Sequence, residues 1–117
     1  MKKIYFARPI HLYNSPQDVR DIKTLQDLGF EVIDPNTKEN DTAYKLEGMV
    51  VFLRLIQQCD GVAFRSFPDG KISTGVFAEI REAIETDKMV IELPALISTR
   101  YLSVNDTREY LKLVGKR

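Results

Sequence analysis

The polar residues between positions 65 and 75 are the first place in this sequence where chemistry is expected. The run from Arg65 to Gly75 is rich in glycine, serine and threonine, and it leads straight into a helical pattern. Backbone N–H groups at the start of a helix, with the positive end of the helix dipole, form a site for an anion such as a phosphate. A polar turn that ends in an N-cap would look the same, so this signal alone leaves both interpretations open.

One carboxylate on the helix that follows is placed unlike its neighbours. The expected apolar stripe of this helix consists of Val76, Ile80, Ala83 and Ile84. Glu79 lies about 60° from Val76 and about 40° from Ala83, on the border of that stripe. Burying half of a carboxylate costs free energy unless hydrogen bonds or a charged partner compensate for the lost water. Functional groups are often found at such positions. The alternative is a surface glutamate paired with Arg81 or Lys88.

Strand-like and helix-like patterns alternate along the chain. Apolar runs rich in β-branched and aromatic residues occur at 4–7, 30–33, 61–64 and 89–93. Helical patterns run from Ser15-Pro16, an N-cap followed by proline, to Gly29, and over about 46–58, 75–86 and 106–114. Such alternation implies right-handed crossovers and a parallel sheet covered on both faces. We therefore predict one α/β domain over 1–117, a three-layer, doubly wound, flavodoxin- or Rossmann-like parallel sheet of about five strands.

A ligand site is expected at the carboxyl ends of the strands, where the strand order of an open parallel sheet reverses. The segments that follow the first and third strand runs, 8–15 and 65–75, are therefore expected to line it. The polar stretch 35–44 is expected to be a loop, and loops of that length are usually functional or mobile. The helix over 46–58 is apolar nearly all round, which predicts burial on more than one side and a contact between subunits.

Composition argues against several classes of protein. Lys plus Arg and Asp plus Glu each number 17, so the formal net charge is zero and nothing suggests a nucleic acid polymer as partner. No stretch approaches the roughly 18 apolar residues of a membrane span, and no signal sequence is visible, so a cytoplasmic location is expected. The single cysteine, Cys59, lies in an apolar run and is expected in the core. No Cys/His cluster is present to bind zinc, so no metal is expected.

Three segments agree in order and spacing with one known family. They are Tyr5-Phe6-Ala7-Arg8-Pro9-Ile10, Cys59-Asp60-Gly61-Val62-Ala63 and Ser73-Thr74-Gly75-Val76-Phe77-Ala78-Glu79. These segments resemble the nucleoside 2-deoxyribosyltransferase family, and within it the 2'-deoxynucleoside 5'-monophosphate N-hydrolases and the CMP N-glycosidases. The resemblance extends from Lys3 to about Leu111. It implies an enzyme that cleaves an N-glycosidic bond without a metal or an organic cofactor.

The resemblance assigns a role to Glu79 and Ser73. Glu79 takes the position of the family nucleophile. Ser73 matches the position at which transferases of free nucleosides carry an acid and nucleotide hydrolases carry a serine that donates to the 5'-phosphate. A carboxylate would repel a phosphate, whereas a hydroxyl beside the helix N-terminus at Gly75 would not.

A segment near the carboxyl end implies an assembly. Arg100-Tyr101-Leu102-Ser103 resembles the family segment whose serine, Ser103 here, reaches the phosphate from the neighbouring subunit. The resemblance therefore implies a homodimer, or a larger homo-oligomer, with shared sites. Tyr5 corresponds to a first-strand aromatic residue near the sugar, and Ile10 and His11 fall where the family contacts base or phosphate.

The chain departs from the family pattern at three places. The aspartate that helps to protonate the leaving base is replaced by Phe52. Arg8, followed by a proline, replaces the usual small residue of the first loop and is counted among the candidate binding residues. The loop before Ser73 carries extra residues, among them Asp69, which we also count as a binding candidate. The candidates to replace the missing acid are Asp60, Asp69 and His11.

We therefore expect a nucleotide N-glycosidase that hydrolyses the base–sugar bond of a nucleoside 5'-monophosphate through a covalent glycosyl–Glu79 intermediate. Base exchange, as in the transferases, and nucleotide binding without catalysis are the main alternatives. A TIR-like NAD glycohydrolase, which also uses a helical glutamate, stays open. So does a cytokinin-activating phosphoribohydrolase of the lysine-decarboxylase-like group, although its Gly-Gly-x-Gly-Thr run is absent here.

Overall fold

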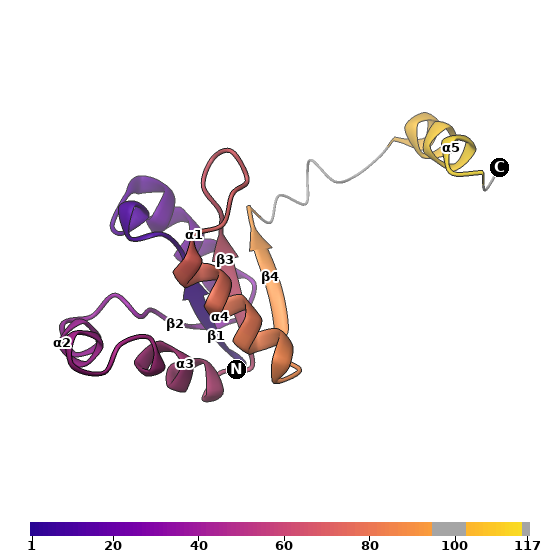
Figure 1. Cartoon of the computed structure of the whole chain (residues 1–117). Helices are drawn as coiled ribbons and strands as arrows, with labels where there is room; N and C mark the ends of the chain where they lie inside the picture. The colour runs from indigo at the N-terminus through magenta and orange to yellow at the C-terminus, as the bar shows by residue number, and fades with distance from the viewer. Residues whose placement is uncertain (95–102, 116–117) are drawn as a thin grey trace.

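Strands and helices alternate in the part of the chain that the computed structural model describes, residues 1–94 and 103–115 (Figure 1). In chain order the elements are β1 (Lys3–Ala7), the 3-10 helix η1 (Ile10–Leu12), α1 (Pro16–Asp27), β2 (Glu31–Ile33), α2 (Lys38–Glu47), α3 (Val50–Gln57), β3 (Gly61–Arg65), α4 (Thr74–Glu85), β4 (Met89–Leu93) and α5 (Val104–Leu113). The predicted α/β class is confirmed.

The four strands of the described residues form one parallel sheet in the order β2-β1-β3-β4. Tyr5 in β1 lies beside Ile33 of β2 on one side and Val62 of β3 on the other. The chain thus leaves β1 on one side to form β2 and returns on the other side to form β3. This arrangement places the reversal of strand order between β1 and β3, as in Rossmann-like folds. The expected sheet had about five strands, one more than is found, although the sequence holds only four apolar runs of strand type.

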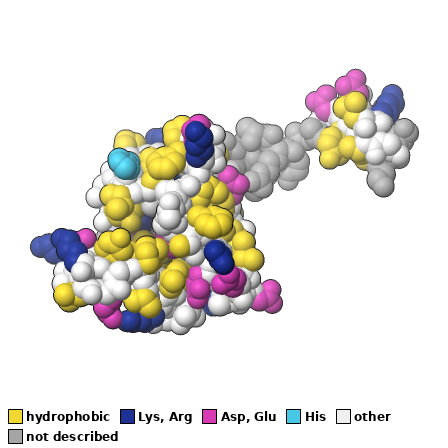
Figure 2. Space-filling model, in the orientation of Figure 1, with side chains coloured by type: hydrophobic (Ala, Val, Ile, Leu, Met, Phe, Trp, Pro, Cys, Tyr) yellow, Lys and Arg dark blue, Asp and Glu magenta, His cyan; other side chains and the backbone are white. Residues whose placement is uncertain are grey.

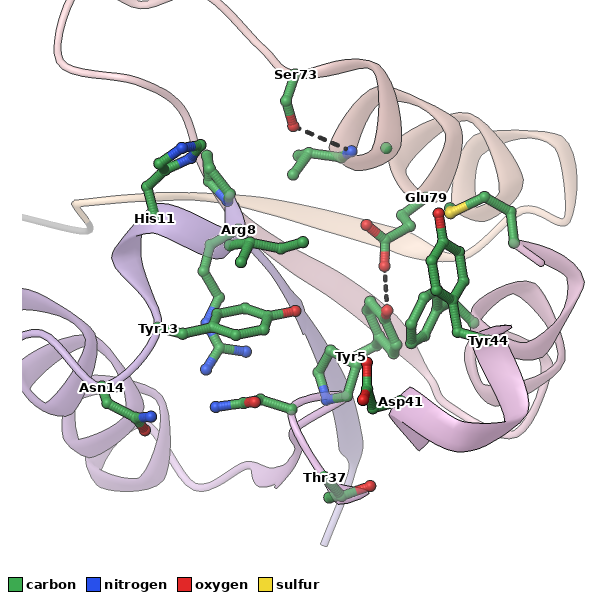
Figure 3. Close-up of a pocket in the computed structure, with 18 of the residues that line it drawn as sticks. Tyr5, Arg8, His11, Tyr13, Asn14, Thr37, Asp41, Tyr44, Ser73 and Glu79 are labelled. Carbon is green, nitrogen blue, oxygen red and sulfur yellow. Dashed lines mark hydrogen bonds between the residues drawn. The ribbon is translucent and has the colours of Figure 1, made fainter. Parts of the chain in front are cut away.

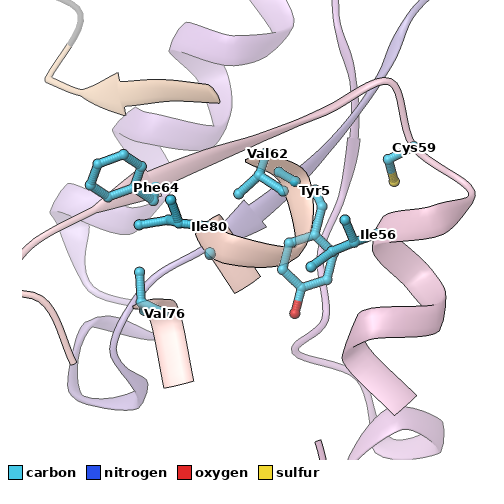
Figure 4. Packing of buried hydrophobic residues seen from close by; sticks show 9 residues of the cluster. Tyr5, Ile56, Cys59, Val62, Phe64, Val76 and Ile80 are labelled. Atoms are coloured by element: carbon cyan, nitrogen blue, oxygen red, sulfur yellow. The ribbon is translucent and has the colours of Figure 1, made fainter. Parts of the chain in front are cut away.

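Side chains of the strands alternate between two apolar clusters, one on each face of the sheet. The cluster under α1 consists of Ile4, Phe6, Leu25, Ala63 and Leu93. The cluster under α3 and α4 consists of Tyr5, Ala7, Ile56, Cys59, Val62, Phe64, Val76, Ile80 and Ala83 (Figure 4). Helices therefore cover both faces, which is the predicted three-layer arrangement, and Cys59 is a core residue as expected.

The segment between β2 and β3 differs from the prediction. Most of the stretch expected to be a loop forms α2, and the helix expected over 46–58 is the shorter α3. Thr37 caps α2 by accepting a hydrogen bond from the Asn40 N–H. Gly48 separates the two helices at φ +78°, a conformation that glycine adopts without a Cβ clash. Of the apolar side chains in α3, Val51 and Ile56 are buried and Val50 is exposed.

Helix α4 begins where the sequence predicts, and its buried face includes a carboxylate. Ser73 is the N-cap, and its hydroxyl accepts from the Val76 N–H. The buried residues of α4 are Val76, Glu79, Ile80 and Ala83. Ile84, which was expected on the same stripe, is 65% exposed instead. The apolar face of α4 is therefore narrower than predicted, and Glu79 occupies part of it.

Candidate active site

A cavity of about 880 Å³ opens at the carboxyl ends of β1 and β3. Its walls come from the segment after β1, from α2 and the start of α3, and from the first turns of α4 (Figure 3). This is where the switch in strand order leaves a crevice, so a cavity lies where the sequence analysis expected a ligand site. The α2 wall was not foreseen.

Glu79 is the buried carboxylate of this cavity. Its side chain reaches from α4 into the cavity, and the residue is only 7% exposed. Burial away from water raises the pKa of Glu79 to about 7, while the hydrogen bond from Tyr5 and the charge of Arg8 act in the opposite direction. The carboxyl group therefore changes its protonation state near neutral pH, which is common for groups that act in catalysis.

Tyr5 is the partner of Glu79. It lies in the middle of β1, is fully buried, and donates its hydroxyl hydrogen to Glu79 Oε2 (Figure 3). Burial and then the charge of Glu79 raise the pKa of Tyr5 far above its ordinary value, so the phenol stays protonated and acts as a donor. The structure thus brings together two residues that the sequence analysis named separately.

The N-terminus of α4 forms the second polar part of the cavity. Ser73 and Gly75 both line it, and the Ser73 Oγ lies 3.4 Å from the Val76 nitrogen that donates to it. A hydroxyl that accepts in this way can still donate its own hydrogen. A Cβ built on Gly75 meets no atom within 4 Å, so the backbone there is open to a ligand. The four-residue step from Gly75 to Glu79 advances about 6 Å along the helix axis.

Arg8 lines the cavity, but its guanidinium already makes four hydrogen bonds to other groups of the protein. Nε and Nη2 donate to the two carboxylate oxygens of Asp18 at 2.7 and 2.9 Å, and Nη1 donates to Asp34 at 2.7 Å. The group lies 4.5 Å from the ring centres of Phe6 and Tyr13. Its side chain is 1% exposed. Arg8 therefore holds the first loop and lends its charge to the site, and its buried, paired guanidinium does not support the binding role expected of it.

The remaining candidates divide between residues in the cavity and residues outside it. Ile10 and His11 line the cavity from η1, with both side chains exposed. Asp60 lies at the amino end of β3, where its carboxylate accepts from the Lys3 N–H at 2.7 Å. This is the opposite end of the sheet from the cavity, so the proposed catalytic role of Asp60 is not supported. Asp69 is exposed in the turn before α4, accepts from the Lys71 N–H, and does not line the cavity.

The phosphate role expected of Ser103 has no counterpart in this single chain. Ser103 caps α5 by accepting from the Asp106 N–H at 3.0 Å and is not among the residues that line the cavity. The three residues before it, 100–102, lie outside the described residues. The phosphate role of Ser103 therefore stays a prediction.

The α2 wall contains the residues that the sequence analysis missed. Asp41 and Tyr44 line the cavity from α2, and the Tyr44 ring stacks on Phe52 with 5.3 Å between ring centres. Thr37 and Lys38 lie at the start of the same wall. The available signal was the capping threonine followed by acidic residues in the first turn, which is typical of a helix start.

Comparison with protein-family models and with curated proteins gives no match. The functional interpretation therefore depends on the site itself. Among residues 1–94 and 103–115, no group of three or more His, Cys, Asp and Glu side chains is placed to hold a metal ion. Within the same residues, no helix has the length and apolar character that crossing a membrane requires.

Proposed function

We propose that this chain hydrolyses the N-glycosidic bond of a nucleoside 5'-monophosphate, with Glu79 as the nucleophile. The observation that carries the proposal is the placement of Glu79. It is a buried carboxylate, held by Tyr5, one helical turn beyond a cavity-lining helix N-terminus. A phosphate at Ser73 and Gly75 would have its sugar beside Glu79, because the advance along α4 is close to the span of a ribose and its 5'-carbon.

The reaction then takes two steps. One oxygen of Glu79 bonds to the anomeric carbon as the bond to the base nitrogen breaks, and the electron pair leaves with the base, which takes up a proton. Water next adds to the anomeric carbon, the ester bond to Glu79 breaks, and a proton is released. The transition states resemble an oxocarbenium ion, as in retaining glycosidases. Tyr5 holds Oε2 of Glu79, which leaves Oε1 free to face the sugar.

Nucleotide binding without turnover is the second candidate. The observation that favours it is the side chain at position 52, where the resemblance leads us to expect an acid. Phe52 lines the cavity and packs on Tyr44, while Asp60 and Asp69 lie elsewhere. His11 is the one earlier candidate acid that lines the cavity.

We also propose that the active form is a homodimer. Several large apolar side chains are exposed on the helices that cover one face of the sheet; they are Leu46, Val50, Phe77 and Ile84. Figure 2 shows apolar side chains spread over the face seen in Figure 1 with α4 in front. A two-fold contact would cover such a surface on both copies. The family resemblance adds the expectation that Ser103 of each copy reaches the phosphate site of the other. A cytoplasmic location stays part of this proposal.

The test is a panel of ribo- and deoxynucleoside 5'-monophosphates, with release of free base and sugar phosphate followed by chromatography. Release of base from at least one of them, and not from the matching free nucleoside, supports the proposal. Adding a second free base separates the two reactions, because a transferase would form a new nucleotide. Binding of nucleotides with no release of base would favour the second candidate.

A further inference from the structure

The second carboxylate of the cavity lies on α2, on the far side of Glu79 from the helix N-terminus. Asp41 and Glu79 are the only carboxylates among the described residues that line the cavity. The Asp41 Oδ2 lies 3.2 Å from the Lys45 Nζ, one turn further along α2. In Figure 3, Ser73 and the α2 residues Asp41 and Tyr44 lie on opposite sides of Glu79. A role for Asp41 is not needed by the two chemical steps above.

The direction of α4 fixes which part of a nucleotide reaches α2. With a phosphate at Ser73 and the anomeric carbon at Glu79, the base must extend away from the start of α4. On that side the cavity is walled by the stacked rings of Tyr44 and Phe52. Aromatic side chains are a common surface on which bases stack, and this stacking does not depend on which base is present.

Stacking alone does not distinguish one base from another, but the carboxylate of Asp41 can. A carboxylate accepts hydrogen bonds and donates none. Bases differ in what they present to it. Cytosine and adenine carry an exocyclic amino group that donates, while uracil and hypoxanthine carry a carbonyl oxygen at the same place, which a carboxylate repels.

We infer that Asp41, beside the aromatic wall of Tyr44 and Phe52, forms the base-recognition subsite and selects nucleotides whose base bears an exocyclic amino group. This inference rests on the proposed function, since that function places the sugar at Glu79. The inference specifies which class of nucleotide the proposed site binds. Asp41 acts here by accepting a hydrogen bond from the amino group. Its ion pair with Lys45 joins two exposed side chains and leaves the carboxylate accessible to a ligand.

The test measures binding, so that it does not depend on turnover. In the Glu79→Gln background, dissociation constants are measured by calorimetry for two pairs that differ only at the amino position, CMP with UMP and AMP with IMP. We expect the amino member of at least one pair to bind about ten- to a hundredfold more tightly. Adding Asp41→Asn, which can also donate to a carbonyl oxygen, should abolish or reverse that preference.

The matched control is Glu39→Gln. Glu39 and Asp41 are both acidic residues of the first turn of α2, but Glu39 does not line the cavity. Both changes remove one negative charge from the same helix end, so only Asp41→Asn should change the preference. Equal binding of both members of each pair, or a preference that survives Asp41→Asn, would overturn the inference and leave the proposed function standing. If none of the four nucleotides and none of their 2'-deoxy counterparts binds, both the inference and the proposed function fail.

Discussion

Tyr5 in β1 donates a hydrogen bond to Glu79 in α4, across 74 positions of sequence and from the centre of the sheet to the helix that covers it. The bond joins a phenol that stays protonated to a carboxyl group whose pKa is about 7. It fixes the orientation of the carboxylate and also favours its ionised form. Both the reaction and the stability of the protein should therefore depend on this pair.

Replacing Glu79 by Gln should lower kcat/KM by several orders of magnitude, because the amide cannot form the glycosyl ester. The side chain keeps its size, so nucleotide affinity should change little. Glu85→Gln is the matched control, since Glu85 lies on the same helix but is exposed and pairs with Arg81. Retention of a tenth of the activity by Glu79→Gln would remove Glu79 from the role of nucleophile.

The same replacement should make the protein more stable at alkaline pH. The pKa of Glu79 is raised from 4.5 to about 7 on folding, so between these values the folded chain holds a proton that the unfolded chain has released. The stability from this group is present below pH 4.5 and is lost as pH rises through 7. The free energy of unfolding of Glu79→Gln minus that of wild type should therefore increase by about 3 kcal/mol from pH 4.5 to pH 8. Urea denaturation at both pH values measures this, and an unchanged difference would contradict it.

Removing the Tyr5 hydroxyl should move the pH dependence of the reaction. The hydrogen bond from Tyr5 lowers the pKa of Glu79, so Tyr5→Phe should raise it above 7. Activity requires the ionised carboxylate, and the acid limb of the kcat/KM profile should shift to higher pH by the same amount. A lower rate with an unshifted acid limb would mean that Tyr5 serves only as packing.

Gly75→Ala should separate binding from folding. The added methyl group meets no protein atom within 4 Å, and alanine is the better helix former, so stability should be equal or higher by up to about 1 kcal/mol. The same methyl group would occupy space that the nucleotide phosphate needs, so affinity should fall at least tenfold by calorimetry. Gly61→Ala is the contrast, because its Cβ would lie 2.7 Å from the Met89 carbonyl oxygen and should destabilise the fold. Unchanged nucleotide affinity in Gly75→Ala would contradict the proposal that the phosphate binds at the N-terminus of α4.

Phe77→Asp should disrupt the dimer without unfolding the subunit. The Phe77 side chain is 55% exposed, whereas Val51 is only 7% exposed and its replacement would damage the core. We expect light scattering to give a monomer with reduced activity. Leu28→Asp, a similar change at a half-exposed site in the C-cap of α1, serves as control. A fully active wild-type monomer would end the dimer proposal.

The sequence predicts the fold and the α4 wall of the cavity well because both depend on local periodicity. Glu79 was found from its angle on a helix with a clear apolar stripe. Helix α2 was missed because it has no buried residue, so no apolar period marks it, and Asp41 and Tyr44 were missed with it. The role of Arg8 was misread because the sequence does not show that Arg8 pairs with Asp18 and Asp34, which lie 10 and 26 positions away. From sequence alone, a paired arginine cannot be told from one that is free to bind a ligand.

The two walls of the cavity differ in how many buried residues they contribute to the core. The wall that holds Glu79 is built on β1 and α4, whose buried side chains form part of the core. The opposite wall is α2, a helix with no buried residues that is separated from α3 by a glycine. Substitutions in α2 should therefore reduce the free energy of unfolding only slightly. In a laboratory selection for a new base preference, we expect the tolerated substitutions to fall in α2. Related chains that bind other bases should differ from this one mainly in α2.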